Sequence, residues 1–200
     1  MTPSKDHLPE EIREKILEAA RERFLVYGFN KTTMAEIAKD CEMSAANLYR
    51  FFDNKLDIAV TMTCSCLADE ESSLSQVIDN FEKSAAEKLR DFIFATLYYN
   101  HKRSSETPHL SEMVNAICQG RMDLVEQHMN HKIQILTSLI QAGNDSGEFA
   151  VSSPEQTAEA ILTATIIFNL PTLTPLFSLE TLEKKAAGLT ELLLKGLLKK

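Results

Sequence analysis

The stretch TTMAEIAKDCEMSAANLYRFF, residues 32–52, predicts two short helices joined by a tight turn. Thr33 and Glu36 form a T-x-x-E capping box, in which the threonine oxygen accepts from an early helix amide and the glutamate reaches back to the cap amide. A helix is therefore expected to begin here. Its apolar residues recur at intervals of three and four and form one buried face, made of Met34, Ile37, Ala38 and Cys41.

A second short helix is expected over residues 45–52, because Ser44 is a favourable N-cap. Leu48 and Phe52 lie one helical turn apart and define its buried side. The opposite side suits a DNA major groove, since asparagine pairs with adenine, arginine with guanine, and an alanine methyl contacts a thymine methyl, while tyrosine donates to phosphate. An ordinary helical hairpin with a solvated face fits the same spacing. The outward side chains are Ala45, Asn47, Tyr49 and Arg50.

Residues 10–60 carry further fixed spacings. The dipeptide Gly28-Phe29 is followed by TTxxxIA at 32–38 and by SxxxLYxxFxNK at 44–55. This pattern resembles the DNA-binding domain of the tetracycline-repressor (TetR) family of bacterial transcription regulators. Two positions depart from it: Glu42 stands where the family usually has the turn glycine, and Asn47 where a small or hydroxyl residue is commoner.

The resemblance implies a helix-turn-helix DNA-binding domain at residues 9–60, with the motif at about 33–52. A long helix is then expected to join it to a helical effector-binding and dimerisation domain at residues 61–200. The implied fold class is all-α. The side chains expected to contact DNA are Lys31, Thr32, Thr33, Ser44, Ala45, Asn47, Tyr49, Arg50 and Lys55.

Helical patterns account for the rest of the chain, and neither strand alternation nor an internal repeat is present. Pro9 favours a helix start and Gly28 a helix end, while the segment 143–154 is a loop rich in Gly, Ser, Asn and Asp. The helices expected outside the motif cover residues 9–27, 53–77, 84–103, 109–119, 121–142, 154–170 and 179–198.

In the family, the middle helices enclose a pocket for a small, usually apolar effector, and the resemblance implies the same here. Thioethers and aromatic rings suit such a pocket, and they suit a ligand-free core equally well. The candidate lining residues are Phe94, Tyr98, Met113, Ile117, Met122 and Met129.

The last two helices are more apolar than one packing face requires, and extra apolar surface is typical of a partner interface. By resemblance, they are expected to pair with their copies in a four-helix dimer bundle. A monomeric core with broad burial is the alternative. The candidate interface residues are Ile161, Ile166, Phe168, Leu189, Leu193 and Leu197.

The charge of the chain argues against nonspecific coating of nucleic acid. The net charge is −8, and 44% hydrophobic with 25% charged residues is ordinary for a globular protein. The first sixty residues contain nine basic and eleven acidic side chains. DNA affinity is therefore expected to be site-specific and to arise from local placement of Lys31, Arg50 and Lys55.

Membrane and redox signals are weak. The segment 1–11 is polar and contains two prolines, and the longest nearly apolar run, 160–170, is about half of what a bilayer requires. Four cysteines form no C-x-x-C pair, so they are expected to be reduced packing residues. These features predict a cytoplasmic protein with no membrane contact.

No catalytic residue, cofactor or metal is predicted, because G-x-S-x-G, glycine-rich phosphate loops and H-E-x-x-H are all absent. His128 and His131 are three residues apart on one expected helix, and with a third ligand such as Asp123 they would offer an alternative metal site.

The sequence as a whole predicts a homodimeric, ligand-responsive transcription regulator. By resemblance, it is expected to be a repressor that a largely apolar small molecule releases from a palindromic double-stranded DNA operator. The competing class is a ligand-binding or protein-interaction protein that keeps the helix-turn-helix only as a scaffold.

Overall fold

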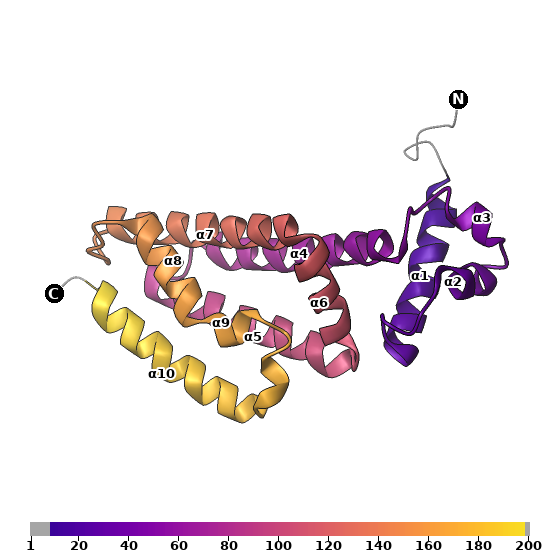
Figure 1. Ribbon diagram of the computed structural model, residues 1–200. Coiled ribbons are helices and arrows are strands. Elements are labelled where there is room, and N and C mark those ends of the chain that lie inside the picture. Colours follow the sequence, from indigo (N-terminus) through magenta and orange to yellow (C-terminus); the bar gives the residue numbers. More distant parts are fainter. Residues whose placement is uncertain (1–8, 199–200) are drawn as a thin grey trace. The chain divides into compact units, whose positions relative to one another are not determined.

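The computed structural model describes residues 9–198, and it is built from helices (Figure 1). Within that range the only pairing outside helices and turns is an isolated antiparallel bridge between Phe149 and Leu198. The all-α prediction is confirmed. The helices are α1 (Glu10–Tyr27), α2 (Met34–Asp40), α3 (Ala45–Leu48), α4 (Lys55–Ile78), α5 (Ala85–Glu106), α6 (Leu110–Gly120), α7 (Met122–Asp145), α8 (Pro154–Ala164), α9 (Ile166–Asn169), the 3-10 helix η2 (Thr174–Leu176) and α10 (Leu179–Leu197).

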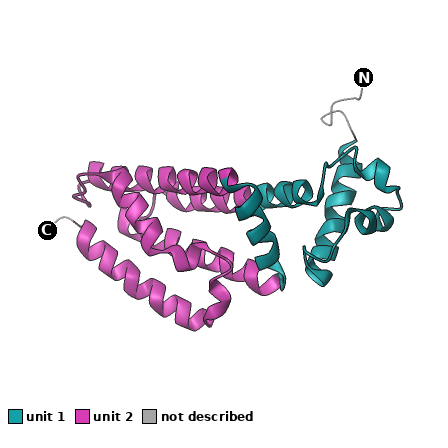
Figure 2. Ribbon diagram, viewed as in Figure 1, with its two compact units in different colours: residues 1–66, 107–122 teal, residues 67–106, 123–200 magenta. Residues whose placement is uncertain are grey.

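The chain forms two compact units, coloured separately in Figure 2. Unit 1 contains the residues up to 66 together with 107–122, and unit 2 contains 67–106 with the residues from 123 onward. The predicted boundary at residue 60 differs from this division in two ways. Helix α4 contributes to both units, and α6 packs with the N-terminal helices although it follows α5 in sequence.

The core of unit 1 holds α1, α2 and α3 together. Gly28 ends α1 with a φ of 86°, a backbone conformation that favours glycine, and its amide donates to the carbonyl of Phe24. The Arg13 guanidinium lies 4.4 Å from the centre of the Phe52 ring and donates to the carbonyl of Phe51. The fully or nearly fully buried apolar side chains include Ile16, Ala20, Phe24, Ile37, Leu48, Phe52 and Ile58.

The second motif helix is shorter than predicted. Regular α-helix ends at Leu48, and the amides of Arg50 and Phe51 bond carbonyls only three residues back. Phe51 and Phe52 are both buried. Bonds to the third residue back are the 3-10 pattern, so the regular helix gives way to a tighter turn after Leu48.

Unit 2 has its own core around α5, which contacts α9, η2 and α10. The first amides of α5 donate to the carboxylate of Glu148: the Ala85 amide nitrogen lies 2.7 Å from one oxygen and the Ala86 amide nitrogen 3.0 Å from the other. The predicted helix 154–170 is broken at Thr165, whose hydroxyl donates back to the carbonyls of Ile161 and Leu162. Such side-chain bonds compete with the helix ladder, although Thr163 and Thr190 make the same bond within unbroken helices.

Among the described residues, no helix combines the length and apolar character that crossing a bilayer would demand.

Candidate nucleic-acid interface

The capping box predicted at the start of α2 is present. The Thr33 hydroxyl accepts from the Glu36 amide at 3.3 Å, and the Glu36 carboxylate accepts from the Thr33 amide at 2.9 Å. These bonds to Thr33 hold the pKa of Glu36 below its usual value. The Arg23 guanidinium on α1 donates to both carboxylate oxygens of Asp40 at the end of α2, from Nε at 2.5 Å and from Nη2 at 3.0 Å. Helix α2 is therefore fixed at both ends.

The turn between α2 and α3 keeps its shape despite the departure at Glu42. This residue has a φ of 57°, the left-handed conformation that a glycine would adopt freely. The Met43 amide donates to the Ala38 carbonyl at 2.9 Å and closes the turn. The Ser44 hydroxyl then accepts from the Asn47 amide at 3.2 Å and starts α3, as predicted for its N-cap.

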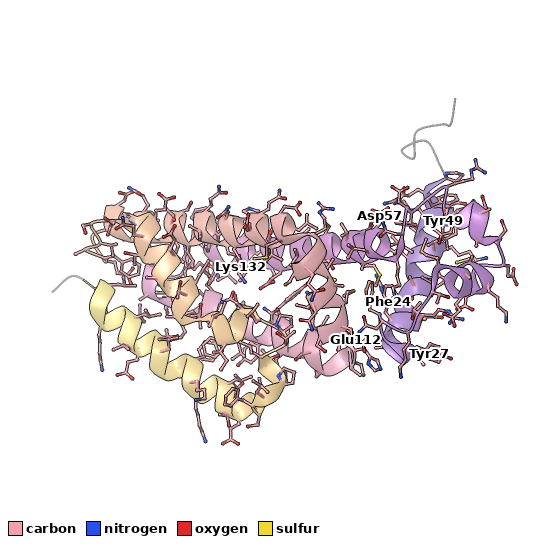
Figure 3. All side chains as sticks on the ribbon, in the orientation of Figure 1. Phe24, Tyr27, Tyr49, Asp57, Glu112 and Lys132 are labelled. Atoms are coloured by element: carbon pink, nitrogen blue, oxygen red, sulfur yellow. The ribbon has the colours of Figure 1, made fainter. Side chains whose placement is uncertain are left out.

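Helix α3 has one buried and one outward side. Leu48 is fully buried and Asn47 is half-buried, whereas Arg50 and Tyr49, the latter labelled in Figure 3, are exposed. The Arg50 guanidinium donates to the Asn47 carboxamide oxygen at 3.4 Å. This bond uses the side-chain oxygen of Asn47, so the side-chain nitrogen stays available to donate to a base edge. The outward amide, phenol and guanidinium therefore stay candidates for DNA contact, together with the exposed Lys31, Thr33 and Ser44 and the half-buried Ala45.

Thr32 does not belong to this surface. Its side chain is only 2% exposed, and its hydroxyl donates to the Gly28 carbonyl at 2.8 Å. The prediction that Thr32 contacts DNA is therefore wrong for its side chain, which instead ties the end of α1 to the following turn.

Lys55 is engaged differently from the prediction of a phosphate contact. Its ammonium donates to the carbonyls of Phe29, Asn30 and Thr32, the last at 2.8 Å, and lies 4.3 Å from the centre of the Phe29 ring. Burial lowers the pKa of Lys55, although nearby carboxylates oppose that shift. Since a lysine has three donors, these carbonyls account for all of them. We therefore revise its role to bracing the turn between α1 and α2.

Replacing Lys55 by methionine is expected to lower the free energy of unfolding by about 1–3 kcal/mol, because three carbonyls lose a charged donor. Chemical denaturation measures this loss. The matched control is Lys31→Met, at an exposed lysine, which is expected to leave stability within about 0.5 kcal/mol. Unchanged stability of Lys55→Met, with a salt slope of DNA binding shallower by about one unit, would restore the phosphate role.

The histidine pair takes part in a charged cluster of unit 2. Nδ1 of His128 lies 2.6 Å and Nδ1 of His131 lies 2.5 Å from the two carboxylate oxygens of Glu71 on α4. No group of three or more His, Cys, Asp or Glu that could hold a metal occurs in the described part of the chain. The two histidines therefore share a carboxylate, which accounts for their spacing.

Beside this pair lies a buried ion pair that sequence reasoning missed. Lys132 on α7 is 1% exposed and donates to Glu70 at 2.7 Å, while Asn100 on α5 donates to the same oxygen at 3.2 Å. Burial alone would raise the pKa of Glu70, but the bond from His128 and the charge of Lys132 lower it to about 2. Burial lowers the pKa of Lys132 as well. Lys132, Asn100 and His128 all direct a nitrogen toward the Glu70 carboxylate, and this arrangement favours its ionised form.

The predicted pocket residues divide between the two units. Met113 and Ile117 are buried within unit 1, which also contains the exposed Met122. In unit 2, Tyr98 donates to Glu183 at 2.8 Å and its ring centre lies 6.0 Å from that of Phe94. Met129 lines an open hollow of about 390 Å³ together with Ile133, Glu159, Leu162, Thr163 and Ile166.

The predicted dimer residues also behave differently from one another. Ile161, Phe168 and Leu197 are buried in the core of unit 2, so the prediction that they face a partner is wrong for these three side chains. Apolar periodicity identified the helices correctly but not which apolar face points inward. Ile166 is exposed, and Leu189 and Leu193 are partly buried against the core. The prediction missed Leu192, which is 68% exposed on α10.

A helix-turn-helix followed by a separate helical unit defines a class, that of DNA-binding regulators with an effector domain. Residues 16–62 match the family of bacterial regulatory proteins named tetR. Residues 85–190, more than half of the chain, match the tetracyclin repressor-like C-terminal domain. The chain belongs to the TetR family of bacterial DNA-binding transcription regulators.

Two relatives are similar in sequence. The HTH-type transcriptional regulator YhgD of Bacillus subtilis is 25% identical over 188 residues, which are 92% of this chain and 96% of YhgD. The mitochondrial ubiquinone biosynthesis protein COQ9 of Xenopus tropicalis is 25% identical over 167 residues, which are 80% of this chain and 49% of COQ9. The chain therefore spans about half the length of COQ9.

Solved structures share the fold. A TetR-family regulator of Mesorhizobium loti aligns with a TM-score of 0.69 at 18% identity, covering 95% of this chain and 98% of that one. SmeT, the repressor of the Stenotrophomonas maltophilia multidrug efflux pump SmeDEF, aligns with a TM-score of 0.68 at 15% identity, covering 98% and 93%. SmeT in complex with triclosan aligns with a TM-score of 0.68 at 16% identity, covering 95% and 93%.

Proposed function

We propose that this regulator is a homodimeric repressor in which two α3 helices bind a palindromic operator. The observation that carries the proposal is the outward set of Asn47, Tyr49 and Arg50 over a fully buried Leu48. In a twofold dimer the two helices would occupy successive major grooves about 34 Å apart, which requires a palindromic site. The similar fold of SmeT, itself a repressor, supports the sign of regulation.

The dimer is proposed to form through α8 and α10. Ile166 on α9, which directly follows α8, and Leu192 on α10 leave apolar surface uncovered, and one chain offers nothing among its described residues to bury it. Isologous contacts between two copies would remove this surface from water. A dimer also supplies the second recognition helix that a palindrome needs.

The effector is proposed to be a small, largely apolar molecule that binds unit 2. The hollow beside Met129 and Leu162 has mostly aliphatic lining, and its volume of about 390 Å³ lies within the range of small-molecule sites. The complex of SmeT, a protein of similar fold, with triclosan supports the proposal of a ligand site. A coupling of about 1.4–3 kcal/mol would lower operator affinity roughly ten- to a hundredfold. A cytoplasmic location follows from the DNA partner.

The direct test is a gel shift with the DNA upstream of the chain's own gene. A retarded complex that a palindromic competitor removes is the expected result. The similarity to COQ9 favours the second candidate, a ligand-binding protein that keeps the helix-turn-helix as a scaffold. That candidate predicts no specific retardation on any fragment, which would overturn the repressor proposal.

Asn47→Ala is expected to weaken operator binding by about 1–3 kcal/mol and to relax the preference at one base position, because a base-reading amide is lost. Titration against operators changed at single positions measures both effects. Asn130→Ala, at an exposed asparagine of α7, is the matched control and should leave binding unchanged. An equal loss on every sequence would contradict the reading role.

A further inference from the structure

Helix α6 contacts the turn that joins α1 to α2 through one carboxylate. Oε2 of Glu112, which is labelled in Figure 3, accepts from the Asn30 amide at 2.8 Å, and the Glu112 side chain lies against Gly28. A Cβ at position 28 would stand 2.7 and 2.8 Å from the two carboxylate oxygens. Glycine at this position therefore ends α1 and also makes room for α6.

The same turn is held from a second helix. Lys55 of α4 donates to the carbonyls of Phe29, Asn30 and Thr32, while Glu112 receives the amide of Asn30. The carboxylate of Glu112 also favours the charged form of Lys55. A carboxylate from α6 thus accepts from an amide of this turn, while an ammonium from α4 donates to its carbonyls. The position of α6 therefore affects the conformation of the turn.

This turn leads directly into the helices proposed to read DNA. Thr33, the N-cap of α2, follows Asn30 by three residues, and Thr32 is fixed to Gly28 by its hydroxyl. Helix α2 in turn contacts α3. A displacement of the turn is therefore passed to the start of α2 and through it to the side that carries Asn47.

Helix α6 has a double membership. Its residues fall within the C-terminal family match at 85–190, yet residues 107–122 pack as part of unit 1. The chain enters α6 from α5 and leaves it into α7, and both neighbours belong to unit 2. Of the helices in the effector-domain match, α6 is the one that joins the compact unit of the helix-turn-helix.

We infer that Glu112 is a positioning residue for operator binding, which links the state of unit 2 to the helix-turn-helix through its hydrogen bond to Asn30. This inference rests on the proposed function. A change in unit 2 that shifts α6 would withdraw the carboxylate, release the turn and move α2 and α3. The link is separate from α4, which reaches the same turn through Lys55.

The test uses the reciprocity of coupled sites. If the state of unit 2 changes DNA binding, then DNA binding must change unit 2. Hydrogen exchange is measured with and without the fragment bound most tightly in gel shifts, at saturating DNA. In the unsubstituted protein, DNA is expected to slow exchange of amides in residues 123–145 by about fivefold or more. In Glu112→Ala this slowing should fall below about twofold, while the Asn30 amide exchanges faster.

Two further variants sharpen the result. Glu112→Gln keeps an oxygen that accepts from Asn30, so it is expected to restore at least half of the slowing even if the alanine variant folds poorly. Glu126→Ala, at an exposed glutamate of α7, should behave as the unsubstituted protein. Equal slowing in Glu112→Ala and the unsubstituted protein would overturn the inference, as would a Gln variant that matches the Ala variant. Failure of the unsubstituted protein to bind any fragment would instead refute the proposed function.

Discussion

Replacing Lys132 by methionine is expected to lower the free energy of unfolding by about 3–5 kcal/mol, the usual range for breaking a buried ion pair from one side. Lys132 is 1% exposed and Glu70 is 2% exposed, with 2.7 Å between the ammonium and a carboxylate oxygen. Methionine fills much of the same space but leaves the carboxylate charged and without its main partner. Urea denaturation of the full chain measures the loss.

The matched control is Lys184→Met, which removes a lysine from the exposed pair with Glu180 on α10. That substitution should change the free energy of unfolding by no more than about 0.5 kcal/mol, because exposed ion pairs contribute little to stability. The double substitution Glu70→Leu with Lys132→Met is expected to recover most of the loss, since neither charge stays buried alone. Equal effects of Lys132→Met and Lys184→Met would contradict the explanation.

The loss should also depend on pH in a defined direction. The pKa of Glu70 is lowered from 4.5 to about 2 in the folded chain, so its ionised form contributes stability above pH 4.5. This contribution disappears as the pH falls from there toward 2. The difference between the unsubstituted protein and Lys132→Met should therefore shrink over the same interval, because a protonated Glu70 no longer needs the cation.

Leu192→Glu is expected to convert the proposed dimer into monomers, with a dissociation constant at least about a hundredfold higher. Leu192 is 68% exposed in the single chain, and Gly188 and Gly196, one turn away on either side, meet nothing that would cover it. In a twofold interface every substitution occurs twice, so two leucines lose about 1.5–3 kcal/mol each and two charges are introduced. Sedimentation analysis across a dilution series measures the shift.

Leu176→Glu is the matched control, because Leu176 on η2 is also 68% exposed but lies outside α8 and α10. It should leave the dissociation constant and operator binding unchanged. Leu192→Glu should also weaken operator binding, since a monomer reads only one half-site. If Leu192→Glu still sediments as a dimer, the interface lies elsewhere. If the unsubstituted chain is monomeric at every concentration, the proposed dimer is refuted.

Local chemistry made the helix-turn-helix predictable. The capping box of Thr33 and Glu36 and the N-cap Ser44 depend on neighbours within three residues, and the structure contains both. The break at Thr165 was missed, because a threonine hydroxyl that bonds its own helix accompanies a break only in some surroundings. Sequence patterns therefore predict reliably those features, such as helix caps, that depend on residues within one turn of each other.

Contacts between distant segments were beyond such patterns. Nothing near Lys55 in sequence reveals that its ammonium meets carbonyls more than twenty residues away, and Glu112 lies 82 residues from Asn30. Burial of Thr32 depends on the same assembled turn. A charge beside a DNA-binding motif looks like a phosphate contact whether it faces solvent or the protein interior, so only the folded arrangement separates the two roles.

The division of labour within α3 bears on how such a regulator diverges. Leu48 anchors the helix in the core, whereas Tyr49 is exposed and the Arg50 guanidinium donates to the Asn47 side chain within the motif. Exchanges at the outward positions are therefore nearly neutral for folding. Gene duplicates of this protein can drift toward new target sites one side chain at a time, while the scaffold beneath stays under constant selection.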